Sequence, residues 1–237
     1  FYAGILFSFI PLEVYFGRTV QPEAIALFST MGALYHWDLS LQGRRPWIDW
    51  AASVTICFLA VSHKLPYAYV LMPLAYLSWH HLKKAAFKDH RTLLACPLVV
   101  LGVYAWYRYA SAGIYVVPAH ASEFLKILNY KRILFYIQFQ ILSRFVEVGT
   151  TYGGLLLFFI GAKEIFRRKK AEIFLAWFAA VWIMIVAGGD YSFYHEYTSL
   201  PFAPINAALM GLGLYTLKKK AGRGAWVPAL HLDHAII

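Results

Sequence analysis

The sequence has few charged residues for its length. Asp, Glu, Lys and Arg make up 14% of the 237 residues, whereas a soluble domain carries about 25%. Hydrophobic residues make up 60% and aromatic residues 18%, so the chain lacks the polar groups that would cover a surface in water. This composition predicts a protein whose apolar faces meet lipid. It excludes a disordered chain and a collagen.

Cysteine and the common catalytic motifs are also scarce. Cys57 and Cys96 both lie within apolar runs, and the topology below places them near opposite faces, so no disulfide is expected. The sequence contains no GxGxxG, P-loop, GxSxG or HExxH motif, which leaves soluble-type nucleotide chemistry without support. The chain opens on Phe1 within an apolar run and without a basic segment before it. We therefore expect a fragment of a longer protein rather than a signal peptide.

What the sequence has instead is a series of apolar runs, which predicts an all-α, polytopic transmembrane protein. We expect about eight spans, at roughly residues 1–16, 22–38, 48–62, 66–80, 92–109, 151–165, 172–187 and 199–217. Residues 1–220 would form one transmembrane domain, the C-terminal part of a longer module. Residues 221–237 would be a short cytoplasmic tail of no assigned role. Ala207 and Gly211, small residues at helical spacing, predict close helix packing.

The basic residues give the predicted orientation. The net charge is +10, and most Lys and Arg residues lie in short clusters between apolar runs, as in the cytoplasmic loops of membrane proteins. If all eight spans cross, the strongly basic clusters fall on one face, which is then cytoplasmic. These clusters are Arg44–Arg45, Lys83–Arg91, Lys163–Lys170 and Lys218–Arg223. The predicted partners are membrane lipids, and no nucleic-acid partner is expected.

The opposite face would carry one long segment, at about 110–150. From Arg132 to Glu147 its polar residues recur at helical spacing, opposite an apolar side that includes Phe135 and Phe145. This pattern predicts a helix that lies in the membrane interface. A ninth span is the alternative, but it would invert the later basic loops.

Few ionisable side chains lie near the predicted outer face, and such groups are costly in a membrane unless they are paired or functional. Arg18 and Lys64 either snorkel to the lipid headgroups or cradle a lipid phosphate. Glu23 suits the first turn of a helix after Pro22, or it contacts Arg18 or a sugar hydroxyl. His63 is either a polar tip residue in water or a catalytic group.

The loop from Asp190 to Tyr197 combines charges with aromatic rings. It is either an interfacial aromatic belt or a wall that binds sugar, with Tyr194 stacking and Glu196 accepting hydroxyls. Asp190 and His195 could ligate a metal by residue type, but no third ligand stands at a recognisable spacing. A divalent metal is therefore left open, and no other cofactor is expected.

Three stretches resemble the GT-C class of membrane glycosyltransferases, in particular the branch of the protein O-mannosyltransferases and the lipid A aminoarabinose transferase. They are Tyr15-Phe16-Gly17-Arg18 followed by Gln21-Pro22-Glu23-Ala24, then Ser62-His63-Lys64-Leu65-Pro66, and then His195-Glu196-Tyr197-Thr198-Ser199-Leu200-Pro201 leading to Pro204. The resemblance covers most of the chain, from the first span to about Lys220. It implies transfer of a sugar from a polyprenyl-phosphate-linked donor to a protein, lipid or glycan acceptor on the non-cytoplasmic face.

The resemblance also implies roles for single residues. Arg18 and Lys64 would hold the lipid phosphate, and Glu23, His195 and Glu196 would line the pocket. The general base of the family sits in the first outer loop, so we expect it upstream of Phe1 and outside this chain. The alternative function is a transporter or flippase for a lipid or small solute, which would place ionisable residues along a path at mid-depth. A non-catalytic membrane scaffold is a third hypothesis.

Overall fold

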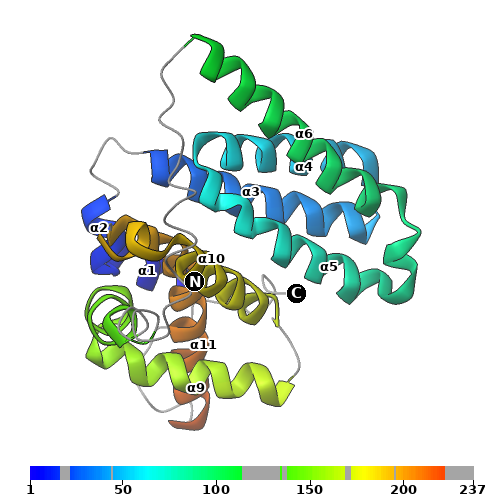
Figure 1. Ribbon diagram of the computed structural model, residues 1–237. Coiled ribbons are helices and arrows are strands. Elements are labelled where there is room, and N and C mark those ends of the chain that lie inside the picture. Colours follow the sequence, from blue (N-terminus) through cyan, green and yellow to red (C-terminus); the bar gives the residue numbers. More distant parts are fainter. Residues whose placement is uncertain are drawn as a thin grey trace.

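The protein is helical throughout the part of the chain that can be described. The structure, a computed structural model, describes residues 1–16, 22–43, 45–113, 134, 138–168, 172–194 and 196–221. Nearly all of these residues lie in helices, and none of them lies in a strand (Figure 1). The predicted all-α class is confirmed for these residues.

Most of the helices stand where an apolar run was predicted. Three short helices have 3-10 geometry (η1, η2 and η4), and η3 is a π-helix. In chain order the elements are α1 (Tyr2–Phe9), α2 (Pro11–Phe16), α3 (Pro22–Gln42), α4 (Pro46–His63), η1 (Leu65–Val70), α5 (Leu71–Leu82), η2 (Lys83–Phe87), α6 (His90–Gly113), η3 (Gln140–Thr150), α9 (Tyr152–Arg168), α10 (Ile173–Tyr194), η4 (Glu196–Phe202) and α11 (Ala203–Ala221).

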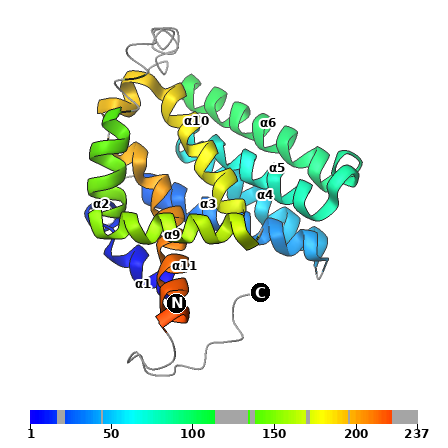
Figure 2. The ribbon, with the colours of Figure 1, turned by 90° about the horizontal axis from the view of Figure 1, so that it is seen from below.

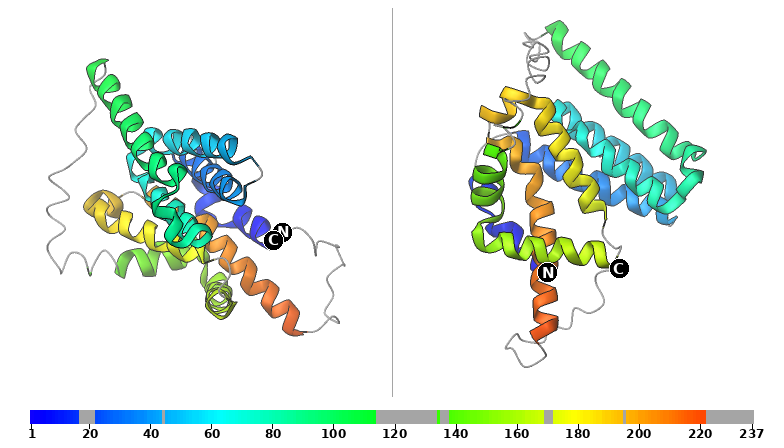
Figure 3. Two further views of the ribbon diagram at one scale, coloured as in Figure 1. Left: turned by 90° about the vertical axis from the view of Figure 1, so that its right-hand side faces the viewer. Right: turned by 60° about the horizontal axis from the view of Figure 1, so that its bottom comes forward.

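The helices form two groups, and α10 joins them. In the first group α3, α4, α5 and α6 lie side by side, with α6 at the outer edge, where it contacts mainly α4 (Figure 3). In the second group α9 crosses α11 at a steep angle, and α1 packs on α11 (Figure 2). α10 contacts α5 and η1 of the first group as well as η4 and α11. As a result, segments from the start, middle and end of the chain meet around η1 and η4.

Small side chains let α3 and α4 approach each other. Ala33 and Ser53 are both fully buried, and the Ser53 hydroxyl donates a 2.7 Å hydrogen bond to the Ala33 carbonyl oxygen. The bond satisfies a hydroxyl that would otherwise be costly to bury. One turn along, Gly32 faces the side chain of Ile56. These contacts fix the position of α3 relative to α4. They thereby also fix the positions of the side chains at the ends of the two helices.

Glycines bring α9 and α11 into backbone contact. A Cβ atom at Gly161 would overlap the carbonyl oxygen of Leu209, and a Cβ atom at Gly213 would overlap the carbonyl oxygen of Leu157. On the other side of α11, a Cβ atom at Gly211 would lie 2.7 Å from the backbone nitrogen of Ala3 in α1. The close packing predicted at Gly211 is thus confirmed, and it extends to both sides of α11.

The first predicted span, 1–16, is not one helix. It is divided into α1, with 8 residues, and α2, with 6 residues. Between them Ile10 has an extended backbone (φ −62°, ψ 124°), because a residue before proline is pushed out of the α region and Pro11 follows. Helices of this length reach only about 9–12 Å at 1.5 Å per residue, so neither crosses a membrane alone.

The predicted interfacial helix is also different over its described part. Residues 114–133 and 135–137 lie outside the described residues, and Gln140–Thr150 is η3. Phe145 is buried and packs edge-on against Phe158 and Phe202, with ring centroids 5.2 and 5.6 Å apart. The apolar side of this segment is therefore covered by other helices of the protein.

Two of the described helices are long and apolar enough to cross a membrane. They are His90–Ala110, within α6, and Tyr197–Ala221, which joins η4 to α11. A shorter apolar stretch, Ile173–Ala187, lies in α10. Length and composition at these helices indicate association with a membrane.

Candidate functional site

The strongest candidate site lies where three distant stretches of the chain meet. Pro22 opens α3, which places Glu23 in its first turn, where a carboxylate is favourable. α4 ends at His63, and Lys64 follows with an extended backbone (φ −155°, ψ 112°) before Pro66 starts η1. Tyr197 comes from η4, near the other end of the chain. These are the three stretches that carry the resemblance described above.

Lys64 is the centre of this cluster. Its ammonium forms an ion pair with Oε1 of Glu23 and lies 3.7 Å from the centroid of the Tyr197 ring. The Tyr67 hydroxyl donates a 3.2 Å hydrogen bond to the Glu23 carbonyl oxygen. The Glu23 side chain is 3% exposed and that of Lys64 is 14% exposed. We call Glu23, Lys64, Tyr67 and Tyr197 the lysine cluster.

Burial and the neighbouring charge act on Lys64 in opposite directions. Burial lowers the pKa of Lys64 to about 8, because an ammonium loses hydration when it leaves water. The Glu23 carboxylate and the face of the Tyr197 ring both favour the charged form. Near neutral pH the cluster therefore holds a protonated amine in a place with little water.

Only one oxygen of the Glu23 carboxylate is paired with Lys64. Its Oε2 atom is buried and has no hydrogen-bond partner among the described residues. A buried carboxylate oxygen without a donor is costly, and such an atom is an unfilled hydrogen-bond acceptor. The lysine cluster thus offers a cation for an anion and an acceptor for a hydroxyl or N–H group.

The other predicted site residues are placed as follows. His63 is exposed, and its Nδ1 atom lies 2.7 Å from the Leu59 carbonyl oxygen of its own helix. Asp190 and Tyr194 lie in the last turns of α10 and Glu196 opens η4, but their side chains lie outside the described part of the structure. Arg18 and His195 lie outside the described residues altogether.

Sequence reasoning missed two residues at this site. Tyr67 is buried and bonded to Glu23, but tyrosines are frequent in this chain and nothing singled it out. Glu13 was missed although a signal was there, since it is the one charged residue in the stretch 1–16. An ionisable residue within an apolar run is by default a candidate for function.

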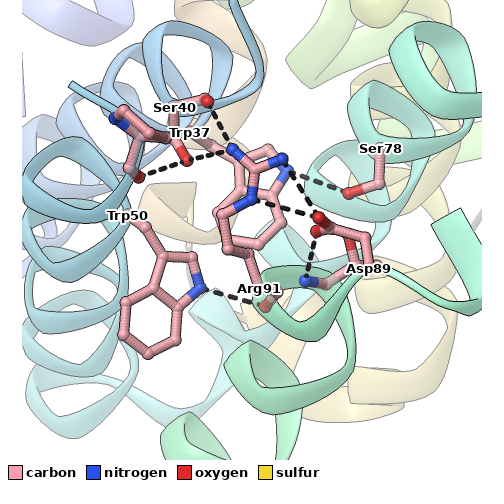
Figure 4. Close-up of polar contacts among 8 residues, drawn as sticks. Trp37, Ser40, Trp50, Ser78, Asp89 and Arg91 are labelled. Carbon is pink, nitrogen blue, oxygen red and sulfur yellow. Dashed lines mark hydrogen bonds and ion pairs between the residues drawn. The ribbon is translucent and has the colours of Figure 1, made fainter. Parts of the chain in front are cut away.

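A second polar cluster lies at the opposite end of α3 and α4 and is centred on Arg91 (Figure 4). The guanidinium donates to the Ser40 carbonyl oxygen at 2.6 Å and to Oδ1 of Asp89 at 3.0 and 3.1 Å. The Trp50 indole donates to the Arg91 carbonyl oxygen at 3.0 Å. We call this the arginine brace, because its bonds tie α3, α4 and the start of α6 together.

Asp89 caps α6 within this brace. The Asp89 carboxylate accepts hydrogen bonds from the backbone N–H and the hydroxyl of Thr92. Burial raises the pKa of Asp89, but these bonds and the Arg91 charge outweigh it and hold the pKa below its ordinary value. Because the carboxylate and guanidinium bind each other and the backbone, the brace has the character of a structural element.

Two histidine–aspartate pairs lie toward the same end. His36 Nδ1 is 3.0 Å from Oδ1 of Asp49, and His81 Nε2 is 2.8 Å from Oδ1 of Asp38. Among the residues that the structure describes, no three His, Cys, Asp or Glu side chains gather where they could hold a metal ion. A divalent metal stays a prediction.

Comparisons with protein families, with curated proteins and with solved structures find no match to this chain. The geometry of the lysine cluster is therefore the basis for a functional assignment.

Proposed function

We propose that the chain is a membrane glycosyltransferase module that takes a sugar from a polyprenyl-phosphate-linked donor, with the lysine cluster as the site for the donor headgroup. The observation that carries this proposal is the position of Lys64. A partly buried ammonium, held by Glu23 and Tyr197, lies where three stretches of distant sequence converge. A cation fixed in a water-poor place interacts strongly with a phosphate.

The distribution of charge supports a multi-pass membrane topology, in which the first of the eight predicted spans is replaced by the two short helices α1 and α2. The lysine cluster lies at the start of α3 and the end of α4, whereas basic residues gather at the other ends of neighbouring helices. Lys83 and Lys84 follow α5, and Lys218–Lys220 end α11. In membrane proteins such basic ends face the cytoplasm, so the lysine cluster would face the non-cytoplasmic side.

The chemistry of the proposed transfer gives Lys64 its role. The acceptor hydroxyl oxygen attacks the anomeric carbon of the sugar, and the bond from that carbon to the phosphate oxygen breaks. The electron pair leaves with the polyprenyl phosphate, and the hydroxyl proton goes to a base. Charge therefore builds on the leaving phosphate, and the Lys64 ammonium stabilises it. Because 14% of the Lys64 side chain is exposed, a phosphate oxygen can approach while Glu23 keeps the ammonium in position.

The position of the charges favours this function over a transporter or flippase. A transport path would place ionisable groups at mid-depth, where they line a path through the bundle. Here the Glu23–Lys64 pair and the arginine brace lie at opposite ends of α3 and α4, about 26 Å apart along 17 residues of α3 at 1.5 Å per residue.

Donor binding tests the proposal. We expect the purified chain in lipid nanodiscs to bind a polyprenyl-phosphate-linked hexose, and Lys64→Met to weaken that binding about tenfold or more, since a hydrogen bond to a charged group contributes about 1.5–3 kcal/mol. Lys64→Arg should retain most of the affinity. The matched control is Lys84→Met, which removes an exposed lysine at the other end of the helices.

Either of two results would overturn the proposal. One is wild-type protein that does not bind the lipid. The other is Lys64→Met protein that folds and binds the lipid as tightly as wild type. Movement of the intact lipid between leaflets, without loss of its sugar when acceptor is present, would favour the flippase instead.

A further inference from the structure

Glu13 is a half-buried acidic residue, and one of its carboxylate oxygens is buried. It lies in α2, and its Oε2 atom is buried without a hydrogen-bond partner among the described residues. A carboxylate oxygen that is removed from water and given no donor destabilises the folded protein. Such a group in a native structure calls for an explanation, and an absent ligand is one of the few available.

Glu13 belongs to the same neighbourhood as the lysine cluster. α2 packs against η4, the element that carries Tyr197. α3, which carries Glu23, also packs against η4, and the Tyr67 hydroxyl donates to the carbonyl oxygen of Glu23. The elements that carry Glu13 and Glu23 therefore meet at η4, and each of the two carboxylates has an Oε2 atom without a partner among the described residues.

The two carboxylates and the lysine would bind different chemical groups of a ligand. An ionised carboxylate oxygen accepts hydrogen bonds and repels a phosphate, whereas an ammonium donates to a phosphate. A ligand that satisfies both must carry O–H or N–H donors next to an anionic group. A sugar joined to a phosphate is such a molecule, because its ring hydroxyls lie within a few bonds of the phosphate oxygen.

We infer that Glu13 is a further ligand-binding residue of this site, whose Oε2 atom accepts a hydrogen bond from a sugar hydroxyl, with Oε2 of Glu23 as a second acceptor. This inference rests on the proposed function and divides its site in two. Lys64 binds the phosphate, and Glu13 accepts a hydrogen bond from the sugar. A sugar hydroxyl would supply the hydrogen-bond donor that Oε2 of Glu13 lacks among the described residues.

The experiment compares two phosphate-diester lipids that carry the same charge and differ only in the group joined to the phosphate. Binding of polyprenyl methyl phosphate, as the sugar-free lipid, and of polyprenyl-phosphate-linked hexose is measured for the full chain in nanodiscs. Glu13→Leu should weaken binding of the sugar-bearing lipid about tenfold, as expected for one lost hydrogen bond to a charged group, and should leave the sugar-free lipid unchanged. Lys64→Met should weaken both. The matched control is Glu147→Leu, which replaces an exposed glutamate of η3 and should affect neither.

The unfolding midpoint separates a binding role from a structural one. If Glu13 only supported the fold, Glu13→Leu would lower the midpoint and weaken both lipids together, and that result would overturn the inference. We expect instead a midpoint at least equal to that of wild type, because the change removes a carboxylate oxygen that is buried without a partner among the described residues. Glu13→Gln, of nearly the same shape, should behave likewise with a smaller loss of sugar binding.

The pattern across variants tells the two proposals apart. If wild type binds both lipids, Lys64→Met weakens both and Glu13→Leu changes neither, then the inference about Glu13 fails while the phosphate site stands. The same conclusion follows if wild type does not prefer the sugar-bearing lipid. If wild type binds neither lipid, or Lys64→Met has no effect, the proposed function fails and the inference fails with it.

Discussion

Lys64 combines two properties that rarely occur in one lysine, since it is largely removed from water and yet held between a carboxylate and an aromatic ring. Its pKa, lowered to about 8 by burial, lies close to physiological pH. A lysine with its ordinary pKa would stay charged far above that pH. The affinity of the site for an anion should therefore depend on pH within the pH range that binding experiments can cover.

We predict that the affinity for a polyprenyl-phosphate-linked sugar decreases as the pH rises above about 8. Above its pKa the Lys64 side chain loses its proton and its charge, so affinity should fall by up to about tenfold per pH unit until the pKa of the complex is reached. The ligand is a phosphate diester whose charge does not change in this range. Titration of binding between pH 6.5 and 9.5 measures the effect.

Lys64→Arg is the control for this titration. Its guanidinium stays protonated at every pH used, so its affinity should be constant where that of wild type declines. A wild-type affinity that does not change between pH 7 and 9.5 would mean that Lys64 does not contact the phosphate.

The sequence singled out Glu23 and Lys64 as candidates, because charges that interrupt apolar runs stand out, but it did not predict that the two would pair with each other. It was not sufficient to pair them with Tyr67, since that contact depends on the position of η1 beside the start of α3. His63 has the same sequence signal as Lys64. Its ring nevertheless bonds to its own helix at Leu59, and the local geometry of a helix end decides this, not the residue type.

The crossing of α9 and α11 depends on the absence of side chains at two positions. At Gly161 and Gly213 the backbone of one helix touches the carbonyl oxygen of the other. No rotamer can relieve an overlap between a Cβ atom and a backbone atom. The crossing can accept a larger residue only if the helices move apart.

We predict that Gly161→Ala destabilises the protein by about 1–3 kcal/mol, the usual range for forced overpacking. The measurement is the unfolding midpoint in detergent, with denaturant as the variable. Gly153→Ala is the matched control within α9, because no atom lies within 4 Å of a Cβ atom placed there. That variant should equal wild type or exceed it slightly, since alanine favours the helix. Equal stability of both variants would contradict the close approach.

The apolar runs of the sequence predicted the positions of the helices better than their lengths and breaks. Apolar runs predict where helices stand, but an apolar count does not register that Pro11 divides the first run. In the same way, the amphipathic stretch around Phe145 has a pattern that fits a lipid surface or a protein surface equally well. The rings of Phe158 and Phe202 cover it, and these come from elements later in the chain.

Along α3 and α4 the charged side chains lie toward the two opposite ends, and none lies in the middle of either helix. The lysine cluster occupies one end, and the arginine brace with the basic residues after α5 occupies the other. If these ends lie on the two sides of a membrane, reagents that cannot cross the membrane will reach one end at a time.

We predict opposite labelling of the two ends in sealed vesicles. In a background with Cys57→Ala and Cys96→Ser, single cysteines are introduced by Leu65→Cys and by Lys84→Cys, both at exposed positions. A membrane-impermeant maleimide added outside should modify one variant, and permeabilised vesicles should be needed for the other. Modification of both variants from the same side would contradict the topology. The cysteine-free parent measures the nonspecific labelling.

The packing of α1 on α11 has a consequence for how the protein is made. Ala3 and Gly211 touch across the two helices, although about 200 residues of chain separate them. At a translation rate of about 5–20 residues per second, the first helix waits on the order of 10–40 s for its partner to leave the ribosome. During that interval a nascent α1 has no glycine surface to pack on, and a holding factor or the lipid itself must shield it.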